Sequence, residues 1–160
     1  MMKAPDASVH ASAVRVGNRA VLIRGPSGSG KSRLAFDLIL AGRSGQIPPS
    51  LLIGDDRVYL EEASRQLVVR AVRELAGLIE IRGLGIRRLD FAEEAVVGLV
   101  VDLSAADAER LPPAEALQTY ILGVQIPRIP VAKGYDPLPL VVAEVTTTNG
   151  SVPADLRLIV

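Results

Sequence analysis

The sequence contains no cysteine and no tryptophan, and aromatic residues make up only 3% of its 160 residues. The missing cysteine excludes disulfide bonds, thiolate catalysis and cysteine-ligated metal sites. Scarce aromatics leave no aromatic and basic surface on which the bases of a nucleic acid could stack. Because 18 acidic side chains balance 18 basic ones, no net field favours a nucleic-acid partner either.

Long apolar runs are also missing. No segment approaches the roughly 20 apolar residues that a membrane-spanning helix needs. The first residues, MMKAPDASVHASAVRV, lack the apolar core of a signal peptide. We therefore expect a cytoplasmic protein that has no membrane partner.

The composition is that of a globular protein, with 49% hydrophobic and 22% charged residues. A chain of this length fits one domain, which we expect over residues 1–150, followed by a frayed tail at 151–160. Because aromatics are few, the core has to consist mainly of Val, Leu, Ile and Ala. The apolar segments predict an α/β protein in which strands outnumber helices.

The expected elements follow from apolar periodicity and from turn residues. Strands are expected at 13–16, 19–24, 51–53, 58–60, 66–72, 96–103 and 120–124, with a tight hairpin turn at 17–18. Helices are expected at 31–41, with Gly42 as the C-cap, and at 105–110, before two prolines. Residues 42–50 and 126–139 are expected to be loops. The stretch 140–148 fits either a strand or a helix.

One motif predicts phosphate binding. Residues 25–32, Gly-Pro-Ser-Gly-Ser-Gly-Lys-Ser, fit the G-x-x-x-x-G-K-[ST] pattern of a P-loop between an expected strand and an expected helix. Glycines let backbone N–H groups surround phosphate oxygens, and the helix N-terminus adds N–H groups and partial positive charge. Lys31 would neutralise the β- and γ-phosphates and be solvated without them, and the Ser32 hydroxyl would bind Mg²⁺. The predicted nucleoside-triphosphate ligands are Gly25, Ser27, Gly28, Ser29, Gly30, Lys31 and Ser32.

Two acidic residues, Asp55 and Asp56, follow a short apolar strand. A carboxylate at a strand end that faces a P-loop is typical of a metal ligand or a general base. Neighbouring side chains on an extended chain point to opposite sides, so the two carboxylates would have different roles. The pair is equally compatible with a turn in which aspartates cap backbone groups.

A second glycine motif, Glu-Ile-Arg-Gly-Leu-Gly-Ile, occupies residues 80–86. Its glycines permit close backbone approach, while its glutamate and arginine can face metal and phosphate respectively. Taken alone, the motif also fits an ordinary strand and turn. The single histidine, His10, is by residue type alone a structural or incidental residue.

Together these segments resemble the C-terminal catalytic domain of HPr kinase/phosphorylase. The resemblance extends from His10-Ala-Ser-Ala-Val through VLIRGPSGSGKS, IGDDRV at 53–58 and EIRGLGI at 80–86 to IPV at 129–131 and LVVAEV at 140–145. It implies a P-loop fold like that of phosphoenolpyruvate carboxykinase, and ATP- and Mg²⁺-dependent phosphorylation of a serine of HPr, the phosphocarrier of the sugar phosphotransferase system. It also implies the reverse reaction and a hexameric assembly. Because the P-loop begins at residue 25, it implies a short form that lacks the family's N-terminal domain.

The resemblance also implies a role for each matching residue. Lys31 binds phosphates, and Ser32 and Glu80 hold Mg²⁺. Asp56 is the general base towards the HPr serine and the general acid in reverse, with support from Asp55. The remaining matches, implied to lie in the active site or to shape its floor beside the nucleotide, are His10, Arg82, Gly83, Leu84 and Gly85.

Three departures from the family pattern bear on function. Arg33 stands where the family usually has Glu, the loop at 42–50 is longer, and Tyr135 stands where the family has a catalytic Arg. Lys133 and Arg128 are the cations of the same segment that can replace it, and the reverse reaction depends on this replacement most. Two other functions stay open: a kinase of another protein or of a small molecule on the same fold, and a nucleotide-binding sensor that does not catalyse.

Overall fold

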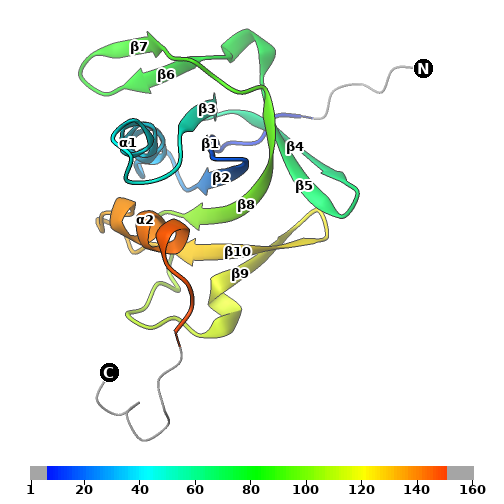
Figure 1. The fold of residues 1–160 in the computed structure, drawn as a ribbon, viewed down its shortest axis with the longest axis vertical. Coiled ribbons are helices and arrows are strands. Elements are labelled where there is room, and N and C mark those ends of the chain that lie inside the picture. Colours follow the sequence, from blue (N-terminus) through cyan, green and yellow to red (C-terminus); the bar gives the residue numbers. More distant parts are fainter. Residues whose placement is uncertain (1–6, 151–160) are drawn as a thin grey trace, which may run out of the picture.

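The computed structural model describes residues 7–150, so the tail expected at 151–160 lies outside the described residues. Its main sheet has eight strands in the order β3-β1-β2-β8-β10-β9, with β5 joined to β8 and β4 joined to β5 (Figure 1). The hairpin β6–β7 forms a separate two-stranded sheet. The strands are β1 (Ser12–Val16), β2 (Arg19–Arg24), β3 (Ser50–Gly54), β4 (Val58–Ala63), β5 (Gln66–Ala71), β6 (Leu78–Ile81), β7 (Gly85–Arg88), β8 (Glu94–Asp102), β9 (Gln118–Ile121) and β10 (Val124–Pro130). The helices are α1 (Lys31–Arg43), α2 (Leu138–Thr146) and two short 3₁₀ segments, η1 (Arg73–Leu75) and η2 (Ala114–Leu117).

Strand β8 organises the sheet. It pairs in parallel with β2 along most of its length, and on its other edge it pairs first with β5 and then with β10. Strands β2, β8 and β10 therefore run parallel, and their carboxyl ends lie side by side at one end of the sheet. Parallel strands in the middle of a sheet are buried on both faces, which explains the nearly continuous apolar runs in β2 and β8.

The two faces of the sheet carry separate apolar clusters. On one face, α1 packs against β1 and β3, and α2 lies beside α1 (Figure 1). This cluster includes Val21, Ile23, Leu34, Leu38 and Val101. The other cluster lies under the β4–β5 arm and includes Ala13, Leu22, Ile53, Leu67 and Val100. Adjacent residues of β2 thus alternate between the two apolar clusters, because successive side chains of a strand point to opposite faces.

Most expected elements are confirmed, including the hairpin turn at 17–18, the helix after the P-loop and the buried strand β8. The ambiguous segment at 140–148 is a helix, α2, over most of its length. No helix among residues 7–150 is long and apolar enough to cross a membrane.

Three expectations about single segments are wrong. Residues 105–110 form turns instead of a helix, because Asp107 is held by Arg128 and the Ala105 N–H bonds Val131. The strand expected at 120–124 is interrupted by a hairpin turn: residues 120–121 end β9, Leu122 and Gly123 adopt positive φ and reverse the chain, and Val124 begins β10. The loop expected at 126–139 is β10 as far as Pro130.

The position of Gly42 differs as well, since α1 continues past it to Arg43. A Cβ added at Gly42 would lie 2.7 Å from the Ser50 hydroxyl oxygen and 2.8 Å from the Ser50 backbone nitrogen. Glycine is therefore required here by the close approach of α1 to the start of β3.

The substitution Gly42→Ala tests this contact. Alanine is the better helix former, yet the clash with the Ser50 backbone should lower the free energy of unfolding by about 1–3 kcal/mol. Denaturant unfolding of Gly42→Ala and of Arg43→Ala, its exposed neighbour, measures the difference. A Gly42→Ala protein as stable as its parent would contradict the tight packing of α1 on β3.

Candidate functional site

The P-loop leaves β2 at its carboxyl end and leads directly into α1. Gly28 and Gly30 have φ values of 80° and 101°, which residues with a Cβ rarely adopt. No atom lies within 4 Å of a Cβ built at either position, so the backbone here faces open space. No side chain caps the N-terminus of α1. Open N–H groups and a helix N-terminus suit the phosphates of a nucleotide.

Lys31 lies at the first turn of α1, and its side chain is buried, with 5% of its surface exposed. Its ammonium donates to the backbone oxygens of Gly25 at 3.0 Å and Pro26 at 3.3 Å. The expectation of a solvated lysine is therefore wrong, because the loop's own carbonyls satisfy the charge. Phosphate binding would exchange these carbonyls for phosphate oxygens.

Ser29 carries a further polar group in this loop. Its hydroxyl oxygen is buried and has no hydrogen-bond partner among the described residues. A buried hydroxyl without a partner is costly. A phosphate oxygen is the kind of acceptor that would satisfy it.

The Asp55 carboxylate joins three elements at the P-loop. Its Oδ1 accepts hydrogen bonds from the Ser32 hydroxyl at 2.6 Å and from the Ser12 hydroxyl at 3.0 Å. Its Oδ2 accepts the backbone N–H of Glu80 at 3.0 Å. Asp55 thereby links α1, β1 and β6, and it places a carboxylate oxygen beside the hydroxyl that the motif predicts as a Mg²⁺ ligand.

Asp56 has a different set of partners. Its backbone N–H donates to the Ser12 hydroxyl at 3.0 Å, and its carboxylate pairs with Nε2 of His10. Its φ of 66° lies in the left-handed region, which is unusual for a residue other than glycine. With 56% of its side chain exposed, Asp56 is accessible to a second molecule. The expectation that the two carboxylates face different partners agrees with these contacts.

The glycine motif at 80–86 forms the β6–β7 hairpin beside α1 (Figure 1). Glu80 reaches the site through its backbone N–H, and its side chain is exposed. Arg82 and Gly83 lie in the exposed turn, where Gly83 has a φ of 90°. Within residues 7–150, no three His, Asp or Glu side chains converge as a ready-made metal site.

Sequence reasoning missed Ser12, whose buried hydroxyl orients both aspartates. Its only signal is a hydroxyl residue within the otherwise apolar run of β1. Sequence reasoning also missed Arg24 and Asp102, which form a bidentate ion pair of 2.7 and 2.8 Å at the ends of β2 and β8. Arg128 donates to Asp102 at 2.5 Å and to both oxygens of Asp107 at 2.8 and 3.0 Å. We call Arg24, Asp102, Arg128 and Asp107 the arginine clamp.

The arginine clamp bears on the expectation that Arg128 or Lys133 replaces the family arginine at the position of Tyr135. Only 14% of the Arg128 side chain is exposed, and two carboxylates occupy its guanidinium. Arg128 is therefore unsuited to act as a free cation for a phosphoryl group. Lys133 and Tyr135, in the loop after β10, are both exposed.

Two hollows in the surface lie away from the P-loop. One is bordered by Leu51 and residues 88–91, and the other by the end of α1 and the start of β3. Neither includes a residue of the P-loop or of the aspartate pair. The residues that the motifs predict thus lie outside these two hollows, at the carboxyl ends of the strands.

Comparison with known proteins shows the family of this chain. The sequence model of the family described as HPr Serine kinase C-terminal domain matches residues 2–152. The chain belongs to this family. It is 35% identical over 144 residues to the HPr kinase/phosphorylase of Mycoplasma mycoides. The aligned region covers 81% of this chain and 44% of that relative. The corresponding relative from Geobacillus thermodenitrificans is also 35% identical over 144 residues, covering 82% and 44%.

A solved structure, that of the Hpr(Ser) kinase/phosphatase from Coxiella burnetii, has the same fold. It superposes with a TM-score of 0.68 at 26% sequence identity, over 88% of this chain and 93% of that chain. The expected strand-rich α/β fold of the P-loop kinase family is therefore confirmed. The chain spans less than half the length of the two curated relatives, 44% in each case.

The substitution Ser12→Ala tests the hydroxyl that orients the aspartates. It leaves the Asp56 N–H without its partner and removes one donor from Asp55, so we expect a loss of stability of about 1–3 kcal/mol. Thermal and denaturant unfolding measure this loss, with Ser44→Ala at the end of α1 as the control. Equal stability of Ser12→Ala and its parent would mean that water replaces the hydroxyl at no cost.

Proposed function

We propose that this chain transfers the γ-phosphoryl group of ATP to a serine of the phosphocarrier protein HPr, and that it also catalyses the reverse reaction. The observation that carries the proposal is the contact between Ser32 of the P-loop and Asp55, with Asp56 and His10 beside it. This arrangement brings together a P-loop, two oxygen groups suited to Mg²⁺ and an exposed carboxylate suited to the role of base. The names of the relatives, HPr kinase/phosphorylase, supply the substrate.

The residues at the P-loop suit ATP and Mg²⁺. Backbone N–H groups of 25–30, the N-terminus of α1 and the Lys31 ammonium would hold the phosphates. The Ser32 hydroxyl and the Asp55 carboxylate are hard oxygen donors, which Mg²⁺ prefers, and the Glu80 carboxylate is the third candidate ligand. When bound, Mg²⁺ neutralises charge on the phosphate oxygens.

Asp56 is proposed as the general base. Its carboxylate would accept the proton of the attacking serine hydroxyl, and in reverse it would return that proton to the departing oxygen. The left-handed conformation and the hydrogen bond to Ser12 hold the Asp56 backbone in place. The ion pair with His10 orients its carboxylate. Arg82 and Gly83, at the end of β6, are proposed to border the nucleotide.

The proposed site has little positive charge to stabilise the phosphoryl group during its transfer. An arginine aimed at the equatorial oxygens contributes about 10³–10⁵ in rate in other phosphoryl-transfer enzymes. Tyr135 stands at the position of the family arginine, and Arg128 is engaged in the arginine clamp. Lys133 is then the proposed cation, and it lacks the bidentate fork of arginine. We therefore expect phosphoryl transfer by this chain to be slow.

The proposal extends to assembly and location. By resemblance to its family the chain is a homo-oligomer, a hexamer, and it works in the cytoplasm. Analytical ultracentrifugation at several protein concentrations measures the assembly directly.

The decisive experiment incubates the protein with ATP, Mg²⁺ and purified HPr, and locates the phosphate by mass spectrometry. Phosphoserine on HPr supports the proposal. ATP turnover with phosphate on another protein points to a different kinase on this fold. ATP binding without any transfer would leave only a nucleotide sensor.

Substitution of the proposed base gives a sharper test. Asp56→Asn keeps the shape and suits the left-handed backbone, but the amide cannot accept a proton. We expect unchanged ATP affinity by calorimetry and a fall in transfer on the order of 10²–10⁴. Transfer close to the parent rate would remove Asp56 from the role of base.

The cation can be tested in both directions. Lys133→Ala should lower transfer by about tenfold or more with little change in ATP affinity, because the charge acts mainly on the transition state. Tyr135→Arg should raise the rate, since it restores a fork at the family position. Single-turnover kinetics measure both variants. If neither variant changes the rate, the loop after β10 supplies no catalytic charge.

A further inference from the structure

The arginine clamp lies where the parallel strands β2, β8 and β10 end. Asp102 is the last residue of β8, and its neighbours in register are Arg24 on β2 and Pro130 on β10. In open α/β sheets, ligands bind outside the carboxyl ends of parallel strands. The acid at the end of the strand beside a P-loop strand holds Mg²⁺ in many P-loop enzymes. Here that acid already accepts three hydrogen bonds from two arginines.

The backbone continues the connection beyond the side chains. The Leu103 N–H donates to the Arg24 oxygen at 2.9 Å, and the Val131 N–H donates to the Asp102 oxygen at 2.9 Å. A Cβ added at Gly25 would lie 3.0 Å from the Leu103 Cβ and 2.6 Å from the Ser29 hydroxyl oxygen. The first residue of the P-loop therefore lies close to Leu103 and Ser29, with no room for a side chain.

Gly25 in turn holds the phosphate-binding lysine, because its carbonyl accepts from the Lys31 ammonium at 3.0 Å. A continuous chain of direct contacts thus runs from Asp102 through Arg24 to Gly25, and from Gly25 to Lys31. Each link in this chain is a covalent bond or a hydrogen bond, so a displacement at Asp102 has a direct route to the Lys31 ammonium.

We infer that Asp102 is a positioning residue for nucleotide binding: held by Arg24 and Arg128, it fixes Gly25 and so sets where the Lys31 ammonium lies. The inference rests on the proposed binding of ATP at the P-loop. Asp102 itself does not touch the nucleotide. Its charge is already neutralised by arginines, which leaves the metal to Ser32 and Asp55.

The electrostatics support a rigid clamp. Burial by itself would raise the pKa of the Asp102 carboxyl, but the hydrogen bonds from Arg24 and Arg128 outweigh burial and hold the pKa below its ordinary value. The carboxylate thus stays ionised throughout the neutral range. Charge-assisted bidentate pairs of this kind fix orientation as well as distance.

The first test measures the affinity for Mg²⁺–ATP by calorimetry in Asp102→Asn, Arg24→Ala and Arg24→Lys. We expect Asp102→Asn and Arg24→Ala to weaken ATP binding by about tenfold, the size of one lost charge-assisted hydrogen bond. Arg24→Lys keeps the charge but loses the fork, so it should recover part of the loss. If Asp102→Asn does not fold, Arg24→Ala and Arg24→Lys decide the matter, because Arg24 lies partly exposed at the edge of the sheet.

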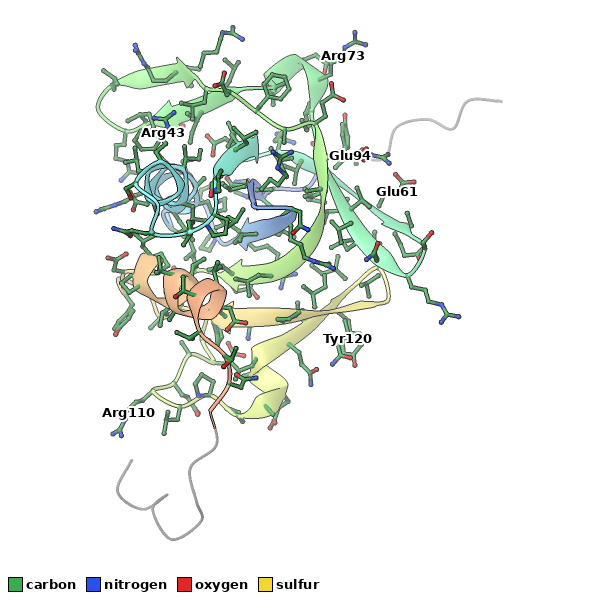
Figure 2. All side chains as sticks on the ribbon, viewed as in Figure 1. Arg43, Glu61, Arg73, Glu94, Arg110 and Tyr120 are labelled. Atoms are coloured by element: carbon green, nitrogen blue, oxygen red, sulfur yellow. The ribbon has the colours of Figure 1, made fainter. Side chains whose placement is uncertain are left out.

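A matched control is available on the opposite side of the molecule. Arg70 also pairs with two carboxylates, Glu61 and Glu94, at 2.5 and 2.8 Å. Figure 2 shows Glu61 and Glu94 together on the β4–β5 side, away from α1 and the P-loop. Arg70→Ala therefore removes a comparable ion-pair network and should leave ATP affinity unchanged.

A double-mutant cycle separates positioning from general destabilisation. If Asp102 acts through Lys31, the effect of Asp102→Asn on ATP affinity should shrink to less than about twofold in a Lys31→Ala background. Unchanged affinity in the folded Asp102 and Arg24 variants would overturn the inference while leaving ATP binding intact. An equal loss with and without Lys31 would also overturn it. A parent protein that binds no ATP would overturn both the inference and the proposed function.

Discussion

The carboxylate of Asp55 accepts hydrogen bonds from the helix that follows the P-loop, from the first strand and from the β6 strand of a separate hairpin. These three elements come from distant parts of the chain and share few other polar contacts. A carboxylate with three donors is held in one orientation, since each oxygen is already directed. Together with the apolar packing of α1 on β1 and β3, this one side chain therefore fixes the P-loop relative to Asp56 and to the glycine motif.

The sheet supplies the rigid frame for that carboxylate. Strand β8 is paired on both edges and buried on both faces, so it has little freedom to move. Its neighbours β2 and β10 end at the same edge and deliver the P-loop and the loop that carries Lys133. The arginine clamp joins the carboxyl ends of these strands, and α1 covers one face of the sheet. Loops that carry function are thus attached to elements that do not bend.

Local sequence signals predicted the parts of the fold that are decided locally. The P-loop pattern, the aspartate pair and the apolar run of β8 each contain their own information within a few residues. The hairpin at Leu122 and Gly123 was missed because a leucine with a φ of 50° is not a usual turn residue. The extent of β10 was missed because Pro127 and Pro130 normally argue against a strand. Neither feature could be read from propensity alone.

Long-range pairs could not be predicted from one sequence. Arg24 and Asp102 are 78 residues apart, and Asp102 and Arg128 are 26 apart. Nothing in the local pattern marks them as partners, and by residue type alone Arg128 fits a free cation equally well. The burial of Lys31 was missed for a different reason: its partners, Gly25 and Pro26, are close in sequence, but their carbonyls are directed by the turn and not by residue type. Ser12 carried only the weak signal of a hydroxyl within an apolar strand.

The left-handed backbone of Asp56 restricts which residue types could take over its proposed role as general base. Asparagine and glycine tolerate such a conformation, but neither can accept a proton, whereas glutamate has the right chemistry and the wrong backbone preference. Conformation and reactivity therefore select different replacements at this position. None of these three residues meets both demands, so the backbone at this position limits which side chains could replace the proposed base.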